Sequence, residues 1–514
     1  MCRILVAIAA FLFAMPAHAA WHRAESAHFV IYADDSEKDL QRYAEMLERY
    51  HAAMAYITQR EVEVPSPSNR VTVYAVGSSR NVRKLAQSRN VGGFYIPRAG
   101  GSAAFVPDVR PSYGELDWST TVLLHEYAHH FLIGSSRFAM PRWMDEGGAE
   151  FFASARFPRS GEVQIGRPAS HRAAELAFAP GVSMEQLFER GNMKRGEGNA
   201  RDDFYGRSWA LYHFLTFDGS RKGQLFDYAQ RIAKGSSSIE AAAAAFGDLS
   251  ALEDDLDGYL KQRKLNGFVL QPDLLPIGPI TITRLSEGME DMMPVIIQSK
   301  RGVNPEEAGE VVEEAREVAA RYPEDADVLA ALAEAELDAG ETDRALAAAD
   351  RALAIQAGTK NALIQRAYAL FAKAETAEDA DSAYANAMKP LSALNRLEQD
   401  HPIPLIYYYR SFAERGISPN DTARHALERA AQLSPFDREL ALHVGLMQAD
   451  EGKIALARHT LMPVATNPHG GGLAVTAQSH LDALADVDEG TRWHPRPALR
   501  TKAISRETSE ETES

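Results

Sequence analysis

The sequence predicts two unlike structural units, an α+β domain followed by an all-α array of helical repeats. Three observations carry this prediction. Strand-like segments precede helical ones in the first half, an Ala-rich helical pattern fills the second half, and charge is divided unequally between the halves. The 514 residues are too many for one hydrophobic core. Hydrophobic residues make up 45% and charged residues 25%, an ordinary globular composition.

The first 20 residues, MCRILVAIAAFLFAMPAHAA, have the pattern of a cleaved secretory signal peptide. Arg3 supplies the positive start, residues 4–15 are apolar, and residues 17–19 form a small-x-small cleavage site. This apolar segment is too short to span a bilayer, and no later segment approaches the ~20 apolar residues of a transmembrane helix. Cys2 is the only cysteine and leaves with the signal. We therefore expect a periplasmic or secreted protein without a transmembrane segment, whose metal ligands, if any, are His and carboxylate.

Charge divides the chain near residue 270. Residues 21–270 contain 30 Lys and Arg against 31 Asp and Glu, whereas residues 271–514 contain 24 against 40. A near-neutral half followed by an acidic half predicts two domains with different surfaces. Neither half has the basic excess that nucleic-acid phosphates require, so we expect no nucleic-acid partner.

Residues 21–270 are predicted to form the α+β unit. HFVIYA (28–33) and VTVYAV (71–76) have strand patterns, with a long amphipathic helix expected between them from Lys38 to Ile57. Residues 92–107 predict a hairpin around a Gly-rich turn. Its segment GGSAAFV (100–106) is expected to be an edge strand that could pair with an extended substrate. Helices follow, including residues 208–217.

The second half is predicted to begin with a Pro-rich linker, residues 271–303. In residues 304–490, small residues recur at helical spacing, as at Ala333, Gly340 and Ala345. This pattern resembles the tetratricopeptide repeat, and implies a concave surface that binds protein partners. We expect about four repeats with an irregular stretch at 360–402. An unrelated helical bundle is the alternative. Residues 491–514 are expected to be a disordered tail.

The segment HEYAH (125–129) predicts a metal site on a helix. His125 and His129 are four residues apart, so both imidazoles lie on one face and can reach the same ion. Glu126 projects about 100° round the helix, beside the ion, where it can act as general base on water that the metal activates. His130 points away by a similar angle and is expected to be a packed or partly exposed histidine.

A second predicted helix, in PRWMDEGGAEFF, supplies a third ligand. Glu146 completes a set of two histidines and one carboxylate, which suits catalytic Zn²⁺. Glu150 lies one turn later on the same face, where it can accept the second N–H of a ligating imidazole. Asp145 is expected to be a first-turn acid favoured by the helix dipole. The glycine pair 147–148 is expected where a neighbouring helix or substrate comes close.

HEYAH, a spacer and WMDEG resemble the gluzincin metallopeptidases, the group that contains thermolysin and the aminopeptidase N family. The resemblance covers chiefly residues 28–217 and implies a zincin-like metallopeptidase domain. Carried over by position, it implies His125, His129 and Glu146 as zinc ligands and Glu126 as general base. Glu150 matches the acid that follows the third ligand by four residues.

Such a hydrolase also needs a donor for the oxyanion. Tyr205, in FYGRSWALYHFL, resembles the transition-state tyrosine of the aminopeptidase family, with Tyr212 and His213 as competitors. His171 lies in a polar segment without a partner motif, and no role is expected for it. The exopeptidase motif that captures a free α-amino group has no counterpart before residue 125, which favours an endopeptidase.

These observations predict an exported zinc metallopeptidase whose helical repeats bind protein partners or substrate. Two alternatives stay open: a protein-binding scaffold whose metallopeptidase-like domain is inactive, and a zinc hydrolase of non-peptide substrates such as peptidoglycan.

Overall fold

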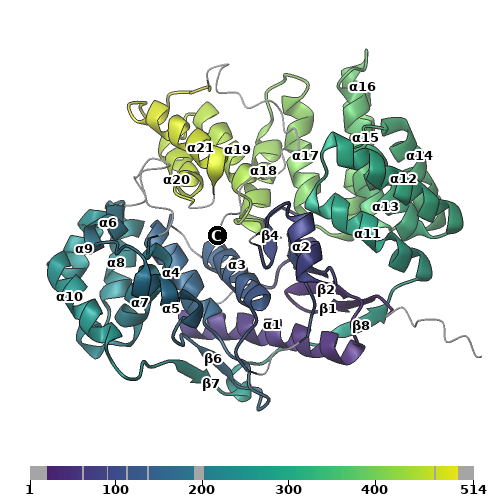
Figure 1. Cartoon of the computed structure of the whole chain (residues 1–514). Coiled ribbons are helices and arrows are strands. Elements are labelled where there is room, and N and C mark those ends of the chain that lie inside the picture. Colours follow the sequence, from purple (N-terminus) through teal and green to yellow (C-terminus); the bar gives the residue numbers. More distant parts are fainter. Residues whose placement is uncertain are drawn as a thin grey trace, which may run out of the picture.

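The computed structural model describes residues 20–60, 63–89, 91–110, 114–135, 138–189, 202–467 and 470–495. Residues 1–19 of the expected signal peptide and 496–514 of the expected tail lie outside this part of the chain. Within it, no helix is both long and apolar enough to cross a membrane. The described elements form a sheet-containing unit and a helical array that pack against each other (Figure 1).

A six-stranded mixed sheet is the centre of the first unit. Its strands are β1 (His22–Glu25), β2 (Phe29–Ala33), β3 (Val71–Ala75), β4 (Phe94–Ile96), β5 (Ala103–Val106) and β8 (Thr281–Arg284). They lie in the order β4-β5-β3-β2-β1-β8. β2, β3 and β5 are parallel, with Phe29 opposite Val71 and Thr72 opposite Ala103. β4, β1 and β8 each run antiparallel to the strands they pair with.

Alternation along the strands sends side chains to two faces of the sheet. On one face, Val71 and Val73 join the main core with helices α1 (Glu37–Thr58) and α3 (Trp118–Ser135). On the other face, Tyr74 and Phe105 pack against Met293 of α11 (Glu287–Arg301), near α2 (Ser79–Leu85). The first helix of the C-terminal half therefore covers the second face of the N-terminal sheet.

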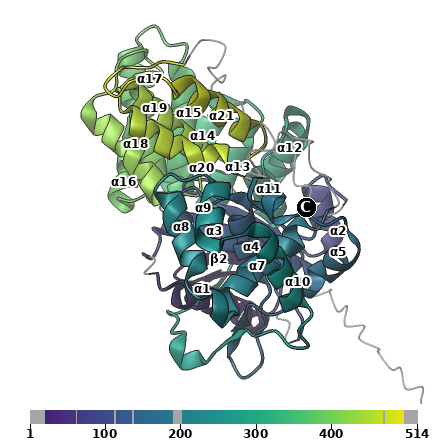
Figure 2. The same cartoon turned by 90° about the vertical axis from the view of Figure 1, so that its left-hand side faces the viewer.

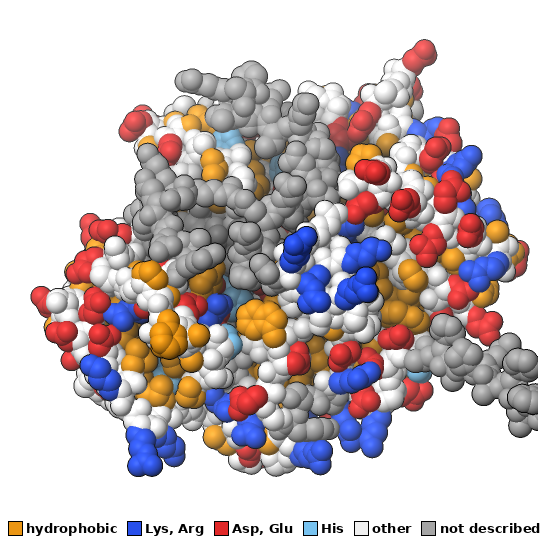
Figure 3. Space-filling view, in the orientation of Figure 1, with side chains coloured by type: hydrophobic (Ala, Val, Ile, Leu, Met, Phe, Trp, Pro, Cys, Tyr) orange, Lys and Arg blue, Asp and Glu red, His pale blue; other side chains and the backbone are white. Residues whose placement is uncertain are grey.

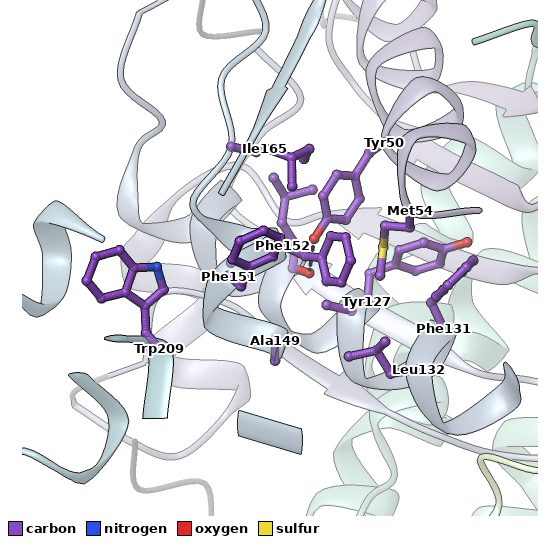
Figure 4. Close-up of a cluster of buried hydrophobic side chains, with 14 of the residues drawn as sticks. Tyr50, Met54, Tyr127, Phe131, Leu132, Ala149, Phe151, Phe152, Ile165 and Trp209 are labelled. Atoms are coloured by element: carbon purple, nitrogen blue, oxygen red, sulfur yellow. Dashed lines mark hydrogen bonds between the residues drawn. The ribbon is translucent and has the colours of Figure 1, made fainter. Parts of the chain in front are cut away.

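The remaining elements of the first unit are helices beside α3 and a two-stranded antiparallel sheet of β6 and β7. They are α4 (Arg142–Ala153), β6 (Val163–Ile165), α5 (Ala173–Phe178), α6 (Met184–Glu189), α7 (Phe204–Phe217), α8 (Gln224–Ala233), α9 (Ser238–Phe246), α10 (Leu249–Leu260) and β7 (Phe268–Leu270). α4 packs between α3 and α7. Figure 4 shows the aromatic core that joins these helices to α1, where the Tyr50 hydroxyl donates to the Leu124 carbonyl at 3.0 Å.

The second unit is an array of packed helices. After α11 come α12 (Pro305–Arg321), α13 (Ala326–Asp338), α14 (Thr342–Ile355), α15 (Lys360–Ala374), α16 (Ala380–Leu397), α17 (Pro402–Ala413), α18 (Asp421–Leu433), α19 (Arg438–Asp450), α20 (Ile454–Ala465) and α21 (Gly471–Leu484). Ala333 and Ala345 are fully buried where α13 meets α14. Gly340 turns the chain between them at φ +79°, a conformation that favours glycine. This is a tetratricopeptide-like helical array.

Residues 271–303 do not form the expected linker. Residues 281–284 form β8, whose Thr283 pairs with Arg23 along β1, and residues 287–301 form α11. Both segments are ordered by contact with the sheet, whose strands lie far earlier in the sequence, which local periodicity does not reveal. The array therefore begins at Glu287, before the expected start at residue 304, and successive pairs run from α11 and α12 onward.

Two further expectations are corrected. β5, in GGSAAFV, is not an edge strand, because it pairs with β3 on one side and β4 on the other. The hairpin puts β4 at the end of the sheet instead. The first residues of the expected tail are ordered, since the Trp493 amide donates to the Ala449 carbonyl of α19 at 3.0 Å.

Asn69 of the sheet-containing unit forms hydrogen bonds with the array. Its side-chain amide donates to the Leu433 carbonyl at 3.1 Å, and its oxygen lies 3.0 Å from both the Gly100 amide and the Ser434 hydroxyl. The Ala99 amide donates to Asp437, the residue that caps α19, at 2.8 Å. α18–α20 therefore lie over the end of the sheet-containing unit that carries α3 and β4 (Figures 1 and 2).

In the face shown in Figure 3, acidic side chains are scattered over the array, whereas Lys and Arg side chains gather over α2. α2 itself contains Arg80, Arg83 and Lys84.

Candidate metal centre

Two consecutive helices, α3 and α4, carry the predicted ligands. α3 starts after Asp117, whose carboxylate accepts a hydrogen bond from the Thr120 amide at 3.0 Å and so satisfies an unpaired donor of the first turn. The helix continues through Gly134, the expected stop, to Ser135. α4 begins at Arg142, after Pro141. His125 and His129 therefore lie one turn apart on α3, facing Glu146 in the second turn of α4.

The structure brings His125, His129 and Glu146 together. The two Nε2 atoms are 3.0 Å apart, and Glu146 Oε2 lies 3.5 Å from His125 Nε2 and 3.4 Å from His129 Nε2. In a tetrahedral zinc site, bonds of about 2.0–2.1 Å separate two ligand atoms by roughly 3.3 Å. Both the donor types and their spacing therefore fit Zn²⁺. Within the described residues this is the one group of His, Cys, Asp or Glu side chains that could hold a metal.

Both imidazoles have their other ring nitrogen on a carboxylate. His129 Nδ1 lies 2.9 Å from Asp145 Oδ1, and His125 Nδ1 lies 3.3 Å from Glu150 Oε1. A carboxylate accepts but does not donate, so each Nδ1 carries a proton, and the neutral form of each imidazole has its lone pair on Nε2, toward Glu146. This is the tautomer that a metal ligand requires.

Negative charge gathers at this point, and it governs the protonation of the histidines. Burial lowers the pKa of His125, but hydrogen bonds to Glu146 and Glu150 outweigh burial and raise it to about 9. Burial likewise opposes the charging of His129, and the Asp145 carboxylate overcomes it and raises the His129 pKa. The arrangement therefore attracts positive charge between the three ligand atoms, which a proton or a metal cation can supply.

Glu150 is held from a second side. Its carboxylate accepts a hydrogen bond from His171 Nε2 at 2.5 Å and from Arg172 Nη2 at 2.6 Å, while it faces His125. It is 1% exposed. Burial raises the pKa of Glu150, but hydrogen bonds with His125 and His171 and the charges of His125 and Arg172 outweigh it and hold the pKa well below its usual range. Glu150 is therefore an ionised carboxylate that orients one histidine and is itself oriented by two basic side chains.

Glu126 lies beside the ligands rather than among them. It is half-buried, and no described residue donates a hydrogen bond to it. Its position follows from the helix, because residue 126 is displaced by about 100° from residue 125. A carboxylate without a hydrogen-bond donor next to a three-ligand site is available to accept a proton.

Tyr205 opens α7 and lies close to the third ligand. The negative charge of Glu146, together with burial, raises the pKa of its hydroxyl, so the hydroxyl stays protonated at neutral pH. The guanidinium of Arg172 lies 4.7 Å from the centre of its ring. Its competitors are elsewhere: Tyr212 packs on Phe151, and His213 Nε2 faces the Gly166 carbonyl at 2.9 Å.

The glycine pair lets α7 approach α4. A Cβ atom at Gly147 would lie 2.4 Å from the backbone oxygen of Ser208, and one at Gly148 would lie 3.0 Å from Leu132 Cδ1. Any side chain at 147 would therefore push α7, and Tyr205 with it, away from the metal centre. Of the two reasons expected for the glycines, the close helix is the one observed.

His130 is packed, as expected, and takes no part in the ligand group. Its Nδ1 lies 2.7 Å from the hydroxyl of Tyr95 on β4, and its ring contacts Phe436 of the array at 4.4 Å between centroids. Burial lowers its pKa to about 3, so it is neutral. It links α3 to the sheet and to the array.

Sequence reasoning missed three side chains of the site. Asp145 was expected only to favour the helix dipole, yet it also holds His129; its position directly before the third ligand was the available signal. His171 and Arg172, which hold Glu150, lie more than 20 residues after it in an irregular segment. No local pattern marks them.

No protein-family model matches this sequence, and a search of curated proteins finds no relative. Similar solved structures include TTC0263, a tetratricopeptide protein of Thermus thermophilus, with 14% identity, a TM-score of 0.32, and coverage of 38% of this chain and 98% of that protein. The RS-1 MamA ArsTM double mutant has 16% identity and a TM-score of 0.27, with 38% and 98% covered. Yeast Tom70 has 12% identity and a TM-score of 0.28, with 71% and 85% covered. At these scores the likeness adds nothing to what the helix packing shows directly.

Fold and site together define a sheet-containing unit with a three-ligand candidate metal centre, joined to a tetratricopeptide-like helical array.

Proposed function

We propose that the chain is an exported zinc-dependent peptidase. The observation that carries the proposal is the convergence of His125 Nε2, His129 Nε2 and Glu146 Oε2 within 3.5 Å of one another, beside a carboxylate to which no described residue donates a hydrogen bond. A catalytic zinc site uses three protein ligands and leaves a fourth position open. The resemblance of HEYAH and WMDEG to the gluzincin metallopeptidases points to peptide-bond hydrolysis by a zincin-like domain.

A zinc ion bound there would supply Lewis acidity, polarising a carbonyl and lowering the pKa of water to about 7. Glu126 accepts a proton from the attacking water at its carboxylate and returns it to the departing amine nitrogen. Tyr205, protonated at neutral pH, donates a hydrogen bond to the oxygen on which negative charge develops. Glu150 and Asp145 hold the two imidazoles in the ligating tautomer throughout.

The substrate is proposed to bind as an extended peptide. β4 is the end strand of the sheet and packs beside α3, to which Tyr95 joins it through His130. An end strand offers backbone N–H and C=O groups to which a peptide can add as a further strand. This role replaces the one first expected for β5, and it favours cleavage within a chain.

The second candidate is a protein-binding scaffold without catalytic activity. The helical array favours it, since repeat arrays present extended surfaces for partner proteins. In that case the buried histidines and carboxylates would form a structural ion-pair network, which also shifts pKa values.

Metal analysis and proteolysis of the chain from residue 21 separate these candidates. We expect about one zinc per chain, and cleavage of a denatured protein that Glu126→Gln reduces by about a hundredfold to ten-thousandfold without loss of zinc. Glu115→Gln is the matched control. Glu115 lies just before α3, is exposed, and pairs with Arg167. Purified protein without stoichiometric metal would contradict the enzyme proposal.

Two other outcomes are informative. Zinc without cleavage of any protein favours the scaffold, or a hydrolase of non-peptide material, which peptidoglycan fragments would test. Cleavage that survives Glu126→Gln would show that another group is the base.

A further inference from the structure

A cavity of about 470 Å³ lies between the candidate metal centre and the helical array. The sheet-containing unit contributes several residues to its walls, among them Phe138, Met140 and Asp145, and α18–α20 with the segments that join and follow them contribute the others, including Pro435 and Val444. The volume and the largely apolar lining are those of a site for a small molecule or for one or two peptide residues. Neither unit forms this cavity alone.

The cavity reaches the metal centre through Asp145. The carboxylate of Asp145 holds His129 Nδ1 at 2.9 Å, and the same residue is part of the cavity wall. A group in the cavity is therefore one side chain away from a metal ligand.

Arg438 is a polar residue of the cavity wall whose buried side chain has no local partner among the described residues. It is the first residue of α19, where the positive end of the helix dipole disfavours a cation. Within the described chain it has no hydrogen bond or ion pair, and its Nε is buried without a partner. Burial lowers its pKa, and Asp145 only partly opposes this effect. A desolvated guanidinium with unused donors matches a carboxylate, which it can bind through two parallel hydrogen bonds.

The acidic groups of the same wall are already engaged. Asp145 holds His129, and Glu428 accepts a hydrogen bond from Gln448 at 3.4 Å. A cationic ligand would therefore meet engaged carboxylates and an adjacent arginine. An anionic ligand would meet the unused donors of Arg438.

We propose that this cavity is a substrate subsite in which Arg438 binds a carboxylate of the peptide, either an acidic side chain or the C-terminal carboxylate. The proposal rests on the proposed peptidase function for its substrate class. It assigns to the array a direct part in substrate recognition, because Arg438 belongs to α19.

Binding can be measured without turnover in the zinc-loaded Glu126→Gln protein, using fluorescence anisotropy of labelled peptides of one length. The first peptide has a central Glu and an amidated C-terminus, and the second has Gln and a free C-terminal carboxylate. The third peptide has a central Gln and the fourth a central Lys, and both have amidated C-termini. The first two distinguish the sources of the carboxylate.

We expect the Glu peptide, the free-carboxylate peptide, or both to bind more tightly than the third and fourth. Arg438→Gln should weaken that preference by about tenfold to a hundredfold, the usual effect of losing hydrogen bonds to a charged group. Arg438→Lys should restore part of it, because the charge remains and the paired geometry does not. Ala441→Phe, which fills the cavity from α19 while Arg438 stays, should weaken binding as well.

Arg429→Gln is the matched control, because this arginine of α18 is exposed and pairs with Asp400 outside the cavity. Tighter binding of the Lys peptide, no peptide binding at all, or binding that Arg438→Gln leaves unchanged would overturn the subsite. A failure of the proposed function can be distinguished from a failure of the subsite. If the wild-type chain cleaves nothing yet Arg438 still selects acidic peptides, the peptidase proposal is wrong and the subsite stands.

Discussion

The metal-site helices and the helical array handle charge in opposite ways. Asp145, Glu146 and Glu150 of α4 are 6%, 0% and 1% exposed, and each faces an imidazole across the helix interface. Many pairs of the array lie at the surface, such as Lys373 with Asp343, whose side chains are 49% and 84% exposed. Buried carboxylates are costly unless paired, whereas exposed pairs contribute little. The difference teaches that the carboxylates of α4 are buried against histidines, whereas many charged pairs of the array stay at its surface.

The two regions also use small residues differently. In the array, a Cβ at Gly445 would lie 2.6 Å from the side chain of Leu461, which can move. At the metal centre, the corresponding obstacle to Gly147 is the backbone of α7, which cannot move without the helix. The helix contact at Gly445 can therefore relax by movement of a side chain. The contact between α4 and α7, which positions Tyr205, cannot.

The largest expected effect is loss of the metal. His129→Asn should weaken zinc binding by more than about a hundredfold, since changes even to the residues that support a ligand cost on the order of 10–100-fold. Zinc content after dialysis measures it. His130→Asn is the matched control, one residue further along the same helix and outside the ligand group. Equal zinc loss in both variants would show that helix integrity, and not ligation, was measured.

Next comes the buried carboxylate. Glu150→Ala leaves His171, Arg172 and His125 without their shared acceptor, and we expect the free energy of unfolding to fall by about 3 kcal/mol. Lys373→Ala, which removes an exposed pair of the array, should change it by less than about 1 kcal/mol. Urea unfolding of the metal-free chain compares the two. Similar values would remove the contrast between the regions.

The glycine contrast predicts a smaller difference. Gly147→Ala should destabilise by about 2 kcal/mol and lower peptidase activity, because the new methyl group displaces α7. Gly445→Ala should cost less, since the Leu461 side chain must shift but no backbone must. Gly258→Ala, at an exposed helical position with open space around it, should stabilise by about 0.5–1 kcal/mol. Activity of Gly147→Ala equal to the wild type would show that α7 does not position the site.

The last expected effect, spread over a range of pH, concerns the seam between the units. His401 lies beside Gly100, where an added Cβ atom would come 3.2 Å from His401 Cε1. Burial lowers the pKa of His401 to about 4, below the ordinary value of about 6.5. The folded protein favours the neutral form of His401. The stabilisation that this histidine contributes is therefore complete above about pH 6.5 and is lost as the pH falls from there toward about 4. In this window the free energy of unfolding should change with pH by up to about 1.4 kcal/mol per pH unit. His401→Gln should flatten the unfolding free energy in this window. An unchanged slope would assign the acid sensitivity to other buried histidines.

The ligand group was predictable because its determinants are local. His125 and His129 are related by one helical turn, and Glu146 and Glu150 by another, so spacing alone orders them. The strands at 29–33 and 71–75 and the amphipathic α1 were equally clear from alternation and helical period. Small residues at Ala333, Gly340 and Ala345 indicated the array for the same reason.

Partners distant in sequence escaped prediction. β8 looked like part of a linker because a four-residue strand has no signal without its partner β1. GGSAAFV was mistaken for an edge strand because alternation shows that a strand exists, but not which neighbours it has. Arg438 looked like any residue of a repeat helix until folding brought α19 over the start of α4.

The sequence by itself determined which residues can act together on one helix, because the helical period places them on one face whatever surrounds them. It thereby supplied the two histidines, the adjacent glutamate and the helix of the third ligand. Only the tertiary structure decided that α4 faces α3, that His171 and Arg172 hold Glu150, and that the array closes a cavity with Arg438 in its wall. These contacts follow from burying apolar surface across the whole chain, and that burial is a property of the packed molecule.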